Sequence, residues 1–170
     1  MAEKYKYLVV ASGEDEGRMR EFVKKALSHL VPDDLRDFNY DRVNGAEAEA
    51  TTIATLAETP PMMAERRVLH IEDAQKLSKA AQEALIAQID AAAARPSGDI
   101  AFVVVYGEGK SPPKAVKDRA GRLEECGKLK WPSDGERWVR DYVRSIGRQM
   151  DGEAVSALVT GMSGLKLPSG

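Results

Sequence analysis

Two adjacent acidic residues, Glu72 and Asp73, directly follow the strand-like run Arg67–Ile71. Acids at the carboxyl end of a strand hold magnesium in nucleotide hydrolases, because hard divalent cations prefer oxygen ligands. Ser78 then has the residue type and the position to begin a helix. The chain therefore carries one half of the arrangement that nucleotide hydrolysis needs.

The other half, a loop that cradles phosphate, is degenerate. In active enzymes the G-x-x-x-x-G-K-[ST] loop aims backbone N–H groups and a lysine at the phosphates. Here the turn after the first apolar run keeps Gly13 and Gly17, but Arg18 takes the lysine position, the hydroxyl is missing and acids lie between the glycines. We predict no bound nucleotide, metal ion or other cofactor and no catalytic residue, and interpret Glu72 and Asp73 as acids inherited with a fold.

Short strand-like runs alternate with longer segments of helical period, which predicts an α/β fold with a parallel sheet flanked by helices. The five expected strands are Tyr5–Val10, Phe38–Val43, Arg67–Ile71, Ile100–Tyr106 and Lys128–Trp131. Apolar residues at helical spacing predict one helix spanning Met19 to Leu30 and another spanning Leu77 to Ile89. These elements would position the acids and the turn at one edge of the sheet.

The composition argues against several classes of protein. A formal net charge of −2 at pH 7 gives no general attraction to nucleic acid or anionic lipid. The single cysteine, Cys126, excludes an internal disulfide, and with only His29 and His70 to join it a four-ligand zinc site is not expected. The sequence shows no secretory signal and no apolar run of bilayer length, so we expect a cytoplasmic protein without membrane contact.

The pattern changes after Pro132, where helical period replaces strand-like runs. Apolar stripes from Trp138 to Ile146 and from Ala154 to Met162 predict two helices. We therefore expect an α/β domain at residues 1–132 and the start of a small helical domain at residues 133–165. Because two helices alone bury little apolar surface, we expect this second domain to be truncated.

The most unusual segment lies between a helical stretch and the third strand. Pro60 and Pro61 cannot occupy a helix interior, so they either begin a short helix or shape a turn. Met62 and Met63, which follow, either fill the space under this turn or are displayed for insertion into an apolar pocket of a partner. Residue chemistry alone favours the first interpretation, because apolar pairs usually belong to cores.

Three segments occur in the order and spacing of the bacterial DNA polymerase III delta subunit, namely Phe38–Gly45, Ala57–Arg67 and Glu72–Ser78. The chain resembles this family from roughly Lys4 to Gly164. The resemblance implies an AAA+-like five-stranded parallel sheet with a degenerate phosphate loop that neither binds nor hydrolyses ATP, followed by part of a helical lid domain. It also implies an N-terminal fragment that lacks the C-terminal collar domain.

The resemblance further implies a function in DNA replication. Members are non-catalytic clamp-loader subunits of the DNA polymerase III holoenzyme, which as a whole is a DNA-directed DNA polymerase and hence a nucleotidyltransferase. They bind the beta sliding clamp and open the ring for loading onto primed DNA. The expected partners are therefore the beta clamp and, in the full-length protein, the tau/gamma and delta-prime subunits. DNA would be contacted through the assembled loader, and no small-molecule substrate is expected.

Two further features refine the resemblance. Sibling subunits complete a neighbour's ATP site with a Ser-Arg-Cys triplet, which is missing from the corresponding stretch Asp118–Cys126, so delta is favoured over delta-prime or tau. In this family two adjacent large apolar residues enter a pocket on the clamp, and these positions fall on Met62 and Met63. Many members carry an aromatic residue there, which this chain lacks. The clamp-binding element implied by the resemblance comprises Thr59, Pro60, Pro61, Met62, Met63, Ala64, Glu65 and Arg66.

Other residues with potential for chemistry have simpler interpretations. His70 has no Ser, Cys or acid at a catalytic spacing, so we predict a half-buried histidine with its hydrogen bonds satisfied. The locally basic run contains Lys110, Lys114, Lys117, Arg119 and Arg122. We interpret it as a solvated helix face rather than a DNA contact, because acids outnumber bases in the whole chain.

Two alternatives from other functional classes remain open. The chain would be an NTPase or phosphotransferase if its atypical loop still bound nucleotide. It would be a receiver-like signalling domain if Asp73 accepted phosphate beside acids that follow the first strand and Lys130 on the fifth strand. The receiver pattern fits poorly, because Ser12 and Gly13 separate the first strand from its acids and Gly107, rather than Ser or Thr, follows the fourth strand.

Overall fold

The computed structural model describes residues 7–95, 97–128, 130, 132 and 134–163. The chain divides into two compact units, Met1–Gly127 and Lys128–Gly170, and each is described by itself. Within these described ranges, no helix combines the length and the apolar character that crossing a lipid bilayer requires.

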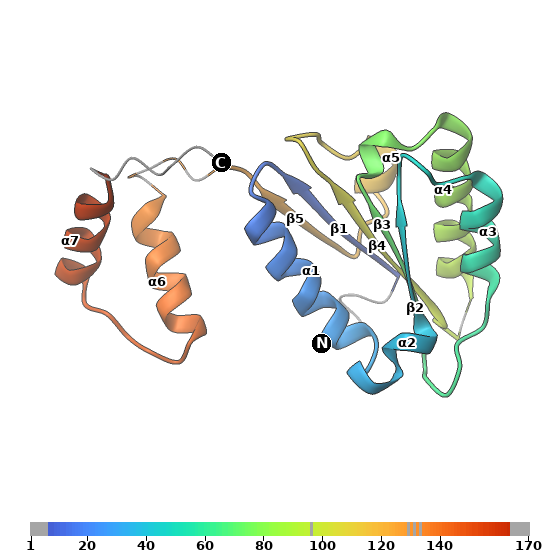
Figure 1. Cartoon of the computed structure of the whole chain (residues 1–170), viewed down its shortest axis with the longest axis horizontal. Helices are drawn as coiled ribbons and strands as arrows, with labels where there is room; N and C mark the ends of the chain where they lie inside the picture. Colours follow the sequence, from blue (N-terminus) through green and yellow to red (C-terminus); the bar gives the residue numbers. More distant parts are fainter. Residues whose placement is uncertain (1–6, 96, 129, 131, 133, 164–170) are drawn as a thin grey trace. The chain divides into compact units, whose positions relative to one another are not determined.

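The first unit is built on a five-stranded sheet in which all neighbouring strands run parallel (Figure 1). Its strands are β1 (Leu8–Gly13), β2 (Tyr40–Asn44), β3 (Arg67–Glu72), β4 (Ile100–Tyr106) and β5 (Arg122–Cys126). Their order across the sheet is β2-β3-β4-β1-β5. The central strand β4 is apolar along nearly its whole length, as expected for a parallel strand buried on both faces. The predicted parallel α/β fold is confirmed.

One face of the sheet is covered by α1 (Glu16–Leu30) (Figure 1). Its apolar stripe, which includes Met19, Val23 and Leu27, packs in one cluster with Val9 and Val103 of the sheet. Helix α1 begins where the Asp15 side chain accepts a hydrogen bond from the Arg18 N–H.

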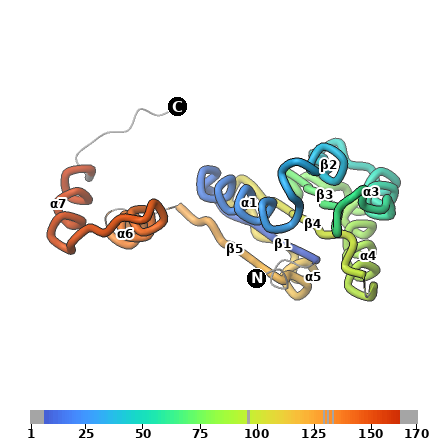
Figure 2. The backbone as a smooth tube through the Cα atoms, turned by 90° about the horizontal axis from the view of Figure 1, so that it is seen from below, coloured from blue at the N-terminus to red at the C-terminus, as the bar shows by residue number. Residues whose placement is uncertain are grey.

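The opposite face is covered by α3 (Ala50–Glu58) and α4 (Lys79–Ala94), which lie side by side (Figure 2). Ile53, Leu85 and Ile89 pack there against Leu69 and Phe102, all of them buried. The predicted helix start at Ser78 is confirmed, since its hydroxyl accepts a hydrogen bond from the Ala81 N–H. The two clusters together form the core of the first unit, and both include residues of β3.

The second strand begins later than predicted. Phe38 and Asn39 belong to the short helix α2 (Arg36–Asn39), and β2 starts at Tyr40. The Asn39 side chain donates to the Leu35 carbonyl and also binds the backbone of Met62, so a tertiary arrangement of hydrogen bonds overrides the strand-like composition of this run. The first strand is also displaced toward the carboxyl end, from the predicted Tyr5–Val10 to Leu8–Gly13, and Tyr5 lies outside the described residues.

The predicted fifth strand, Lys128–Trp131, is wrong. Lys128 and Lys130 are not in a strand, while Leu129 and Trp131 lie outside the described residues. The fifth strand is β5, which pairs with β1 alone at the edge of the sheet. An edge strand is only partly buried and tolerates charged residues, which explains why its sequence Arg-Leu-Glu-Glu-Cys lacks an apolar run.

The sheet order excludes the receiver-like alternative. Receiver domains share the flavodoxin-like order 2-1-3-4-5, in which the first strand lies beside the second. Here β1 lies between β4 and β5. Lys130, which that alternative places on the fifth strand, is not in any strand.

The described residues of the second unit form two helices, α6 (Gly135–Ser145) and α7 (Gly152–Ser163). Val139, Val155 and Val159 form a small buried cluster between them. Large apolar side chains of both stripes stay exposed, namely Trp138, Tyr142, Ile146, Leu158 and Met162. The unit begins at Lys128, whereas we expected the helical domain to begin at residue 133. Ser133 and the residues beyond 163 lie outside the described part of the chain.

Candidate functional site

The turn between β1 and α1 uses its backbone donors internally. The N–H groups of Glu14 and Asp15 both donate to the Cys126 carbonyl at 3.0 Å, and the Arg18 N–H donates to the Asp15 side chain at 3.0 Å. A phosphate loop aims such N–H groups at its ligand. In this chain the Cys126 carbonyl, at the carboxyl end of β5, accepts the hydrogen bonds of Glu14 and Asp15.

The conformation of the turn fits this tight contact. Gly13 has φ +140°, and a Cβ atom added to it would lie 2.0 Å from the Cys126 carbonyl oxygen. Gly17 is exposed in the first turn of α1, and the Arg18 guanidinium pairs with Glu124 of β5 at 3.8 Å. Gly13 and Arg18 of the degenerate loop therefore stabilise the junction of β1, β5 and α1.

The acids at the carboxyl end of β3 are paired with cations. Glu72 forms an ion pair with Arg42 of β2 at 3.0 Å. Asp73 has φ +49° and accepts from the Lys76 ammonium at 3.0 Å, and this hydrogen bond is the main reason that its pKa is lowered. In the described part of the chain, no three His, Cys, Asp or Glu side chains cluster closely enough to hold a metal ion. The geometry supports a structural role for both acids.

His70 lines a cleft of about 730 Å³ beside α1, on the sheet face that this helix covers. It is only 4% exposed, and its Nδ1 is 2.8 Å from the Tyr40 hydroxyl, while its buried Nε2 has no partner among the described residues. Burial, and secondly the charge of Arg42, lower the pKa of His70 to about 4. The ring is therefore neutral near pH 7. It is more deeply buried than predicted, and only one of its two nitrogens is bonded.

The segment between α3 and β3, residues 59–66, is an irregular loop that we call the methionine loop. Thr59 ends α3, and its hydroxyl donates to the Thr55 carbonyl at 2.8 Å. Pro60 and Pro61 follow and shape a turn rather than starting a new helix. The loop lies at the amino end of β3, opposite the end that carries Glu72.

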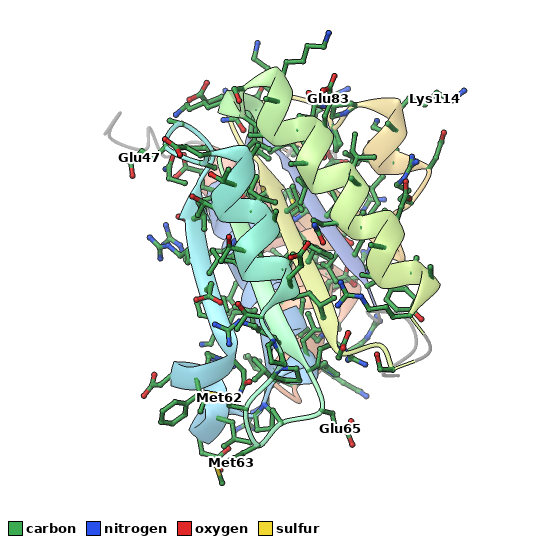
Figure 3. The ribbon with its side chains drawn as sticks, turned by 90° about the vertical axis from the view of Figure 1, so that its right-hand side faces the viewer. Glu47, Met62, Met63, Glu65, Glu83 and Lys114 are labelled. Carbon is green, nitrogen blue, oxygen red and sulfur yellow. The ribbon has the colours of Figure 1, made fainter. Side chains whose placement is uncertain are left out.

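Both methionines of this loop face solvent. Met62 is 55% exposed and Met63 is 90% exposed, so neither belongs to the core. Met63 has φ +55°, a left-handed conformation that costs a residue with a Cβ roughly 1–2 kcal/mol. In Figure 3 both side chains lie at the end of the sheet where α2 is found, and Glu47 lies at the other end. Strained and exposed apolar residues of this kind indicate a surface kept for a function other than stability.

Asn39 holds the methionine loop in place. Its side chain is fully buried, accepts from the Met62 N–H at 2.7 Å and donates to the Met62 carbonyl at 2.8 Å. The same amide nitrogen donates to the Leu35 carbonyl at 2.9 Å. Asn39 thus makes both hydrogen bonds that a neighbouring strand would make to Met62, and it fixes the orientation of the loop backbone.

The charged end of the loop is tied to the body of the first unit. Arg66 donates to the Gly98 carbonyl at 2.7 Å. The Arg67 guanidinium, 11% exposed, pairs with Asp41 at 2.7 Å and donates to the Phe38 carbonyl at 2.8 Å. Arg66 belongs to the predicted clamp-binding element, whereas Arg67 makes its hydrogen bond and ion pair within the first unit. Ala64 is half-buried, and Glu65 is exposed.

Sequence reasoning missed the structural roles of Asn39 and Arg67. Each acts on a segment more than twenty residues away, so no local pattern could pair them. The sequence did contain one signal, because Asn39 is polar although it lies within the predicted strand Phe38–Val43. A buried amide at such a place needs partners for its donors and acceptor.

The basic run does not form one helix face as predicted. It is divided between the loop before α5, the short helix α5 (Lys114–Lys117), the loop after it and β5. Several of its cations have acidic partners: Lys117 lies 3.4 Å from Glu125 and Arg119 lies 2.6 Å from Asp90. These pairs reduce the positive charge that DNA phosphates would meet.

Comparison with known proteins gives a consistent result. The family described as DNA polymerase III, delta subunit, matches residues 7–118, and no curated protein matches. Among solved structures, the DNA clamp loader delta protein of Bacillus subtilis is similar with a TM-score of 0.67 and 19% identity, covering 89% of this chain and 47% of that protein. A DNA polymerase III gamma subunit-related protein of Thermotoga maritima is similar with a TM-score of 0.53 and 14% identity, covering 94% of this chain and 58% of that protein.

These structural likenesses concern the fold. With the sheet order β2-β3-β4-β1-β5 they show an AAA+-like α/β architecture. The chain spans less than two thirds of the length of either protein.

Proposed function

The chain belongs to the DNA polymerase III delta subunit family, and from this premise we propose that it binds the beta sliding clamp through the methionine loop and favours the opened ring. The proposed role is that of a clamp-loader subunit that acts by binding, without hydrolysing ATP itself. In the full-length protein the other partners would be the tau/gamma and delta-prime subunits, and DNA would be reached through the assembled loader.

The observation that carries this proposal is the exposure of two adjacent methionines on a braced loop. Binding energy at protein interfaces is concentrated in a few apolar side chains that fill pockets on the partner. Met62 and Met63 are exposed in the free protein, and the Asn39 hydrogen bonds hold the backbone that carries them. Because the loop is ordered before binding, little conformational entropy has to be lost in the complex. The flexible thioether side chains can then adapt to the shape of a pocket.

The internal use of the phosphate-loop donors supports a role without ATP hydrolysis. The Glu14 and Asp15 N–H groups already donate to the Cys126 carbonyl, so a phosphate would have to displace a backbone hydrogen bond acceptor. A subunit that does no chemistry can still do work by binding one conformer of its partner more tightly than another. Opening of the clamp then depends on how much more tightly the loop binds the opened ring than the closed ring. The geometry of this turn does not favour the NTPase alternative. Magnesium-dependent ATP turnover by the purified chain would support that alternative again.

Calorimetric titration of the chain with the beta clamp tests the proposal. The Met62→Ala/Met63→Ala variant removes side chains that are 55% and 90% exposed, which together correspond to about 3 kcal/mol of apolar burial if both become fully buried. We expect an affinity about a hundredfold weaker and an unchanged thermal unfolding temperature.

The matched control is Met150→Ala/Met162→Ala, which removes two other methionines that are 40% and 39% exposed in the second unit. This control should bind like the wild type. Equal clamp affinity of the Met62→Ala/Met63→Ala variant and the wild type would refute the assignment of the binding loop.

A further inference from the structure

The methionine loop has an exposed aromatic neighbour on another element. Phe38 of α2 is 56% exposed, although the adjacent Asn39 is fully buried. Among the described residues of the first unit, the large apolar side chains that are exposed are Phe38, Met62 and Met63. Exposed apolar residues scattered singly need no explanation, but those gathered in one place indicate an interaction surface.

Hydrogen bonds bring together the two segments that carry these three side chains. Asn39 binds both the N–H and the carbonyl of Met62. Phe38 directly precedes Asn39, and Met63 directly follows Met62. The two segments are 23 residues apart in sequence. In Figure 3 the labelled Met62 and Met63 lie beside α2, the helix that carries Phe38.

Arg67 holds the backbone of Phe38 from a second element. The Arg67 guanidinium donates to the Phe38 carbonyl at 2.8 Å while it pairs with Asp41, the third residue after Phe38. Since the Arg67 and Asp41 side chains are only 11% and 27% exposed, this pair is better shielded from water than a surface ion pair. The backbones of Phe38 and Met62 are therefore both held before any partner binds, which lowers the entropy cost of binding.

We infer that Phe38 is a third anchor of the clamp-binding surface, and that Asn39 is the positioning residue that sets it beside Met62 and Met63. The inference rests on the proposed function, because it takes the clamp as the occupant of this surface. Aromatic residues are enriched among interface hot spots, and thioethers make favourable contacts with aromatic rings. Asn39 contributes no exposed surface and acts through the residues it holds.

Calorimetric titration with the beta clamp, using four variants of the chain, tests the inference. Phe38→Ala should bind about tenfold more weakly than the wild type, since one exposed aromatic anchor is lost. Tyr142→Ala is the matched control, because Tyr142 is an aromatic residue of α6 with nearly the same exposure, 55%. It should bind like the wild type. Phe38 is on the surface, so Phe38→Ala should keep the wild-type thermal unfolding temperature.

The positioning role of Asn39 has its own readout. Asn39→Ala should weaken clamp binding about tenfold and speed up hydrogen exchange of the Met62 amide, whose acceptor is removed. Phe38→Ala should leave that exchange rate unchanged. A loss of stability alone would change exchange throughout the first unit, whereas the expected change is confined to the methionine loop.

The outcomes separate this inference from the proposed function. If Met62→Ala/Met63→Ala binds the clamp like the wild type, both are overturned. If that variant loses binding but Phe38→Ala keeps wild-type affinity, the function stands and the third anchor is wrong. If Asn39→Ala keeps both the affinity and the slow Met62 exchange, its positioning role is wrong.

Discussion

The free energy of unfolding should decrease when the pH falls from 7 to 5, because His70 is buried in its neutral form. Burial, and secondly the positive charge of Arg42, lower its pKa from 6.5 to about 4. In the unfolded chain the imidazole regains its ordinary pKa of about 6.5. Between these two values the unfolded state binds more protons than the folded state, so stability rises with pH across this window and is lost as the pH falls.

The expected size of this effect follows from the two pKa values of His70. Their difference corresponds to about 3 kcal/mol over the whole window, and to about 2 kcal/mol between pH 7 and pH 5. Two carboxyl groups with lowered pKa values, Asp73 and Asp90, do not interfere. Hydrogen bonds from Lys76 and Arg119 lower these pKa values below 3.8, outside the measured interval.

Urea unfolding at pH 7 and pH 5, followed by circular dichroism, measures the effect. His70→Leu removes the titrating group and should lose about 2 kcal/mol less than the wild type on acidification. Tyr40→Phe is the matched control, because it removes the 2.8 Å hydrogen bond to Nδ1 but keeps the buried imidazole. It should retain the pH dependence of the wild type.

One result would show that this reasoning is mistaken. If the wild type and His70→Leu lose the same free energy of unfolding between pH 7 and pH 5, the His70 ring is not held neutral by burial. The cleft beside α1 would then have to be open enough for water to solvate a charged imidazole.

Two further predictions concern stability. Arg67→Met should lower the free energy of unfolding by about 3 kcal/mol, because it leaves the shielded carboxylate of Asp41 without its partner. The control Lys79→Met, at a side chain that is 91% exposed, should change the free energy of unfolding little. A similar loss in both variants, measured by urea unfolding, would contradict the assigned role of Arg67. Gly13→Ala should lower the thermal unfolding temperature by several degrees, because the new Cβ would lie 2.0 Å from the Cys126 carbonyl oxygen. Gly127→Ala is the control, because no atom lies within 4 Å of a Cβ added there. Equal unfolding temperatures of the two variants would show that the β1–α1 turn can relax.

The interior of the fold could be predicted from the sequence because burial leaves a local pattern. Ile100–Tyr106 was predicted with the bounds that the structure gives, since a parallel strand buried on both faces is a nearly continuous apolar run. The stripe of α1 was predicted for the same reason. The edge strand β5 could not be predicted, because it is buried on neither face completely and its charged residues resemble a loop.

The candidate site was only partly predictable. Proline and methionine in adjacent pairs mark the segment after α3 by their own properties, because Pro60 and Pro61 cannot continue a helix. The hydrogen bonds from Asn39 to Met62 join residues 23 positions apart, so they depend on the tertiary structure. The loop could therefore be located from the sequence. The structure was needed to identify Asn39, which holds the loop, and Phe38 on the neighbouring helix α2.

The hydrogen bonds to the Cys126 carbonyl have a consequence for engineering a phosphate loop into this chain. A lysine at position 18 and a hydroxyl at position 19 would not be enough, because the Glu14 and Asp15 amides would remain bonded to β5. The hydroxyl would also place a polar group in the core, where Met19 is 4% exposed. A redesign would therefore have to change β5 together with the β1–α1 turn.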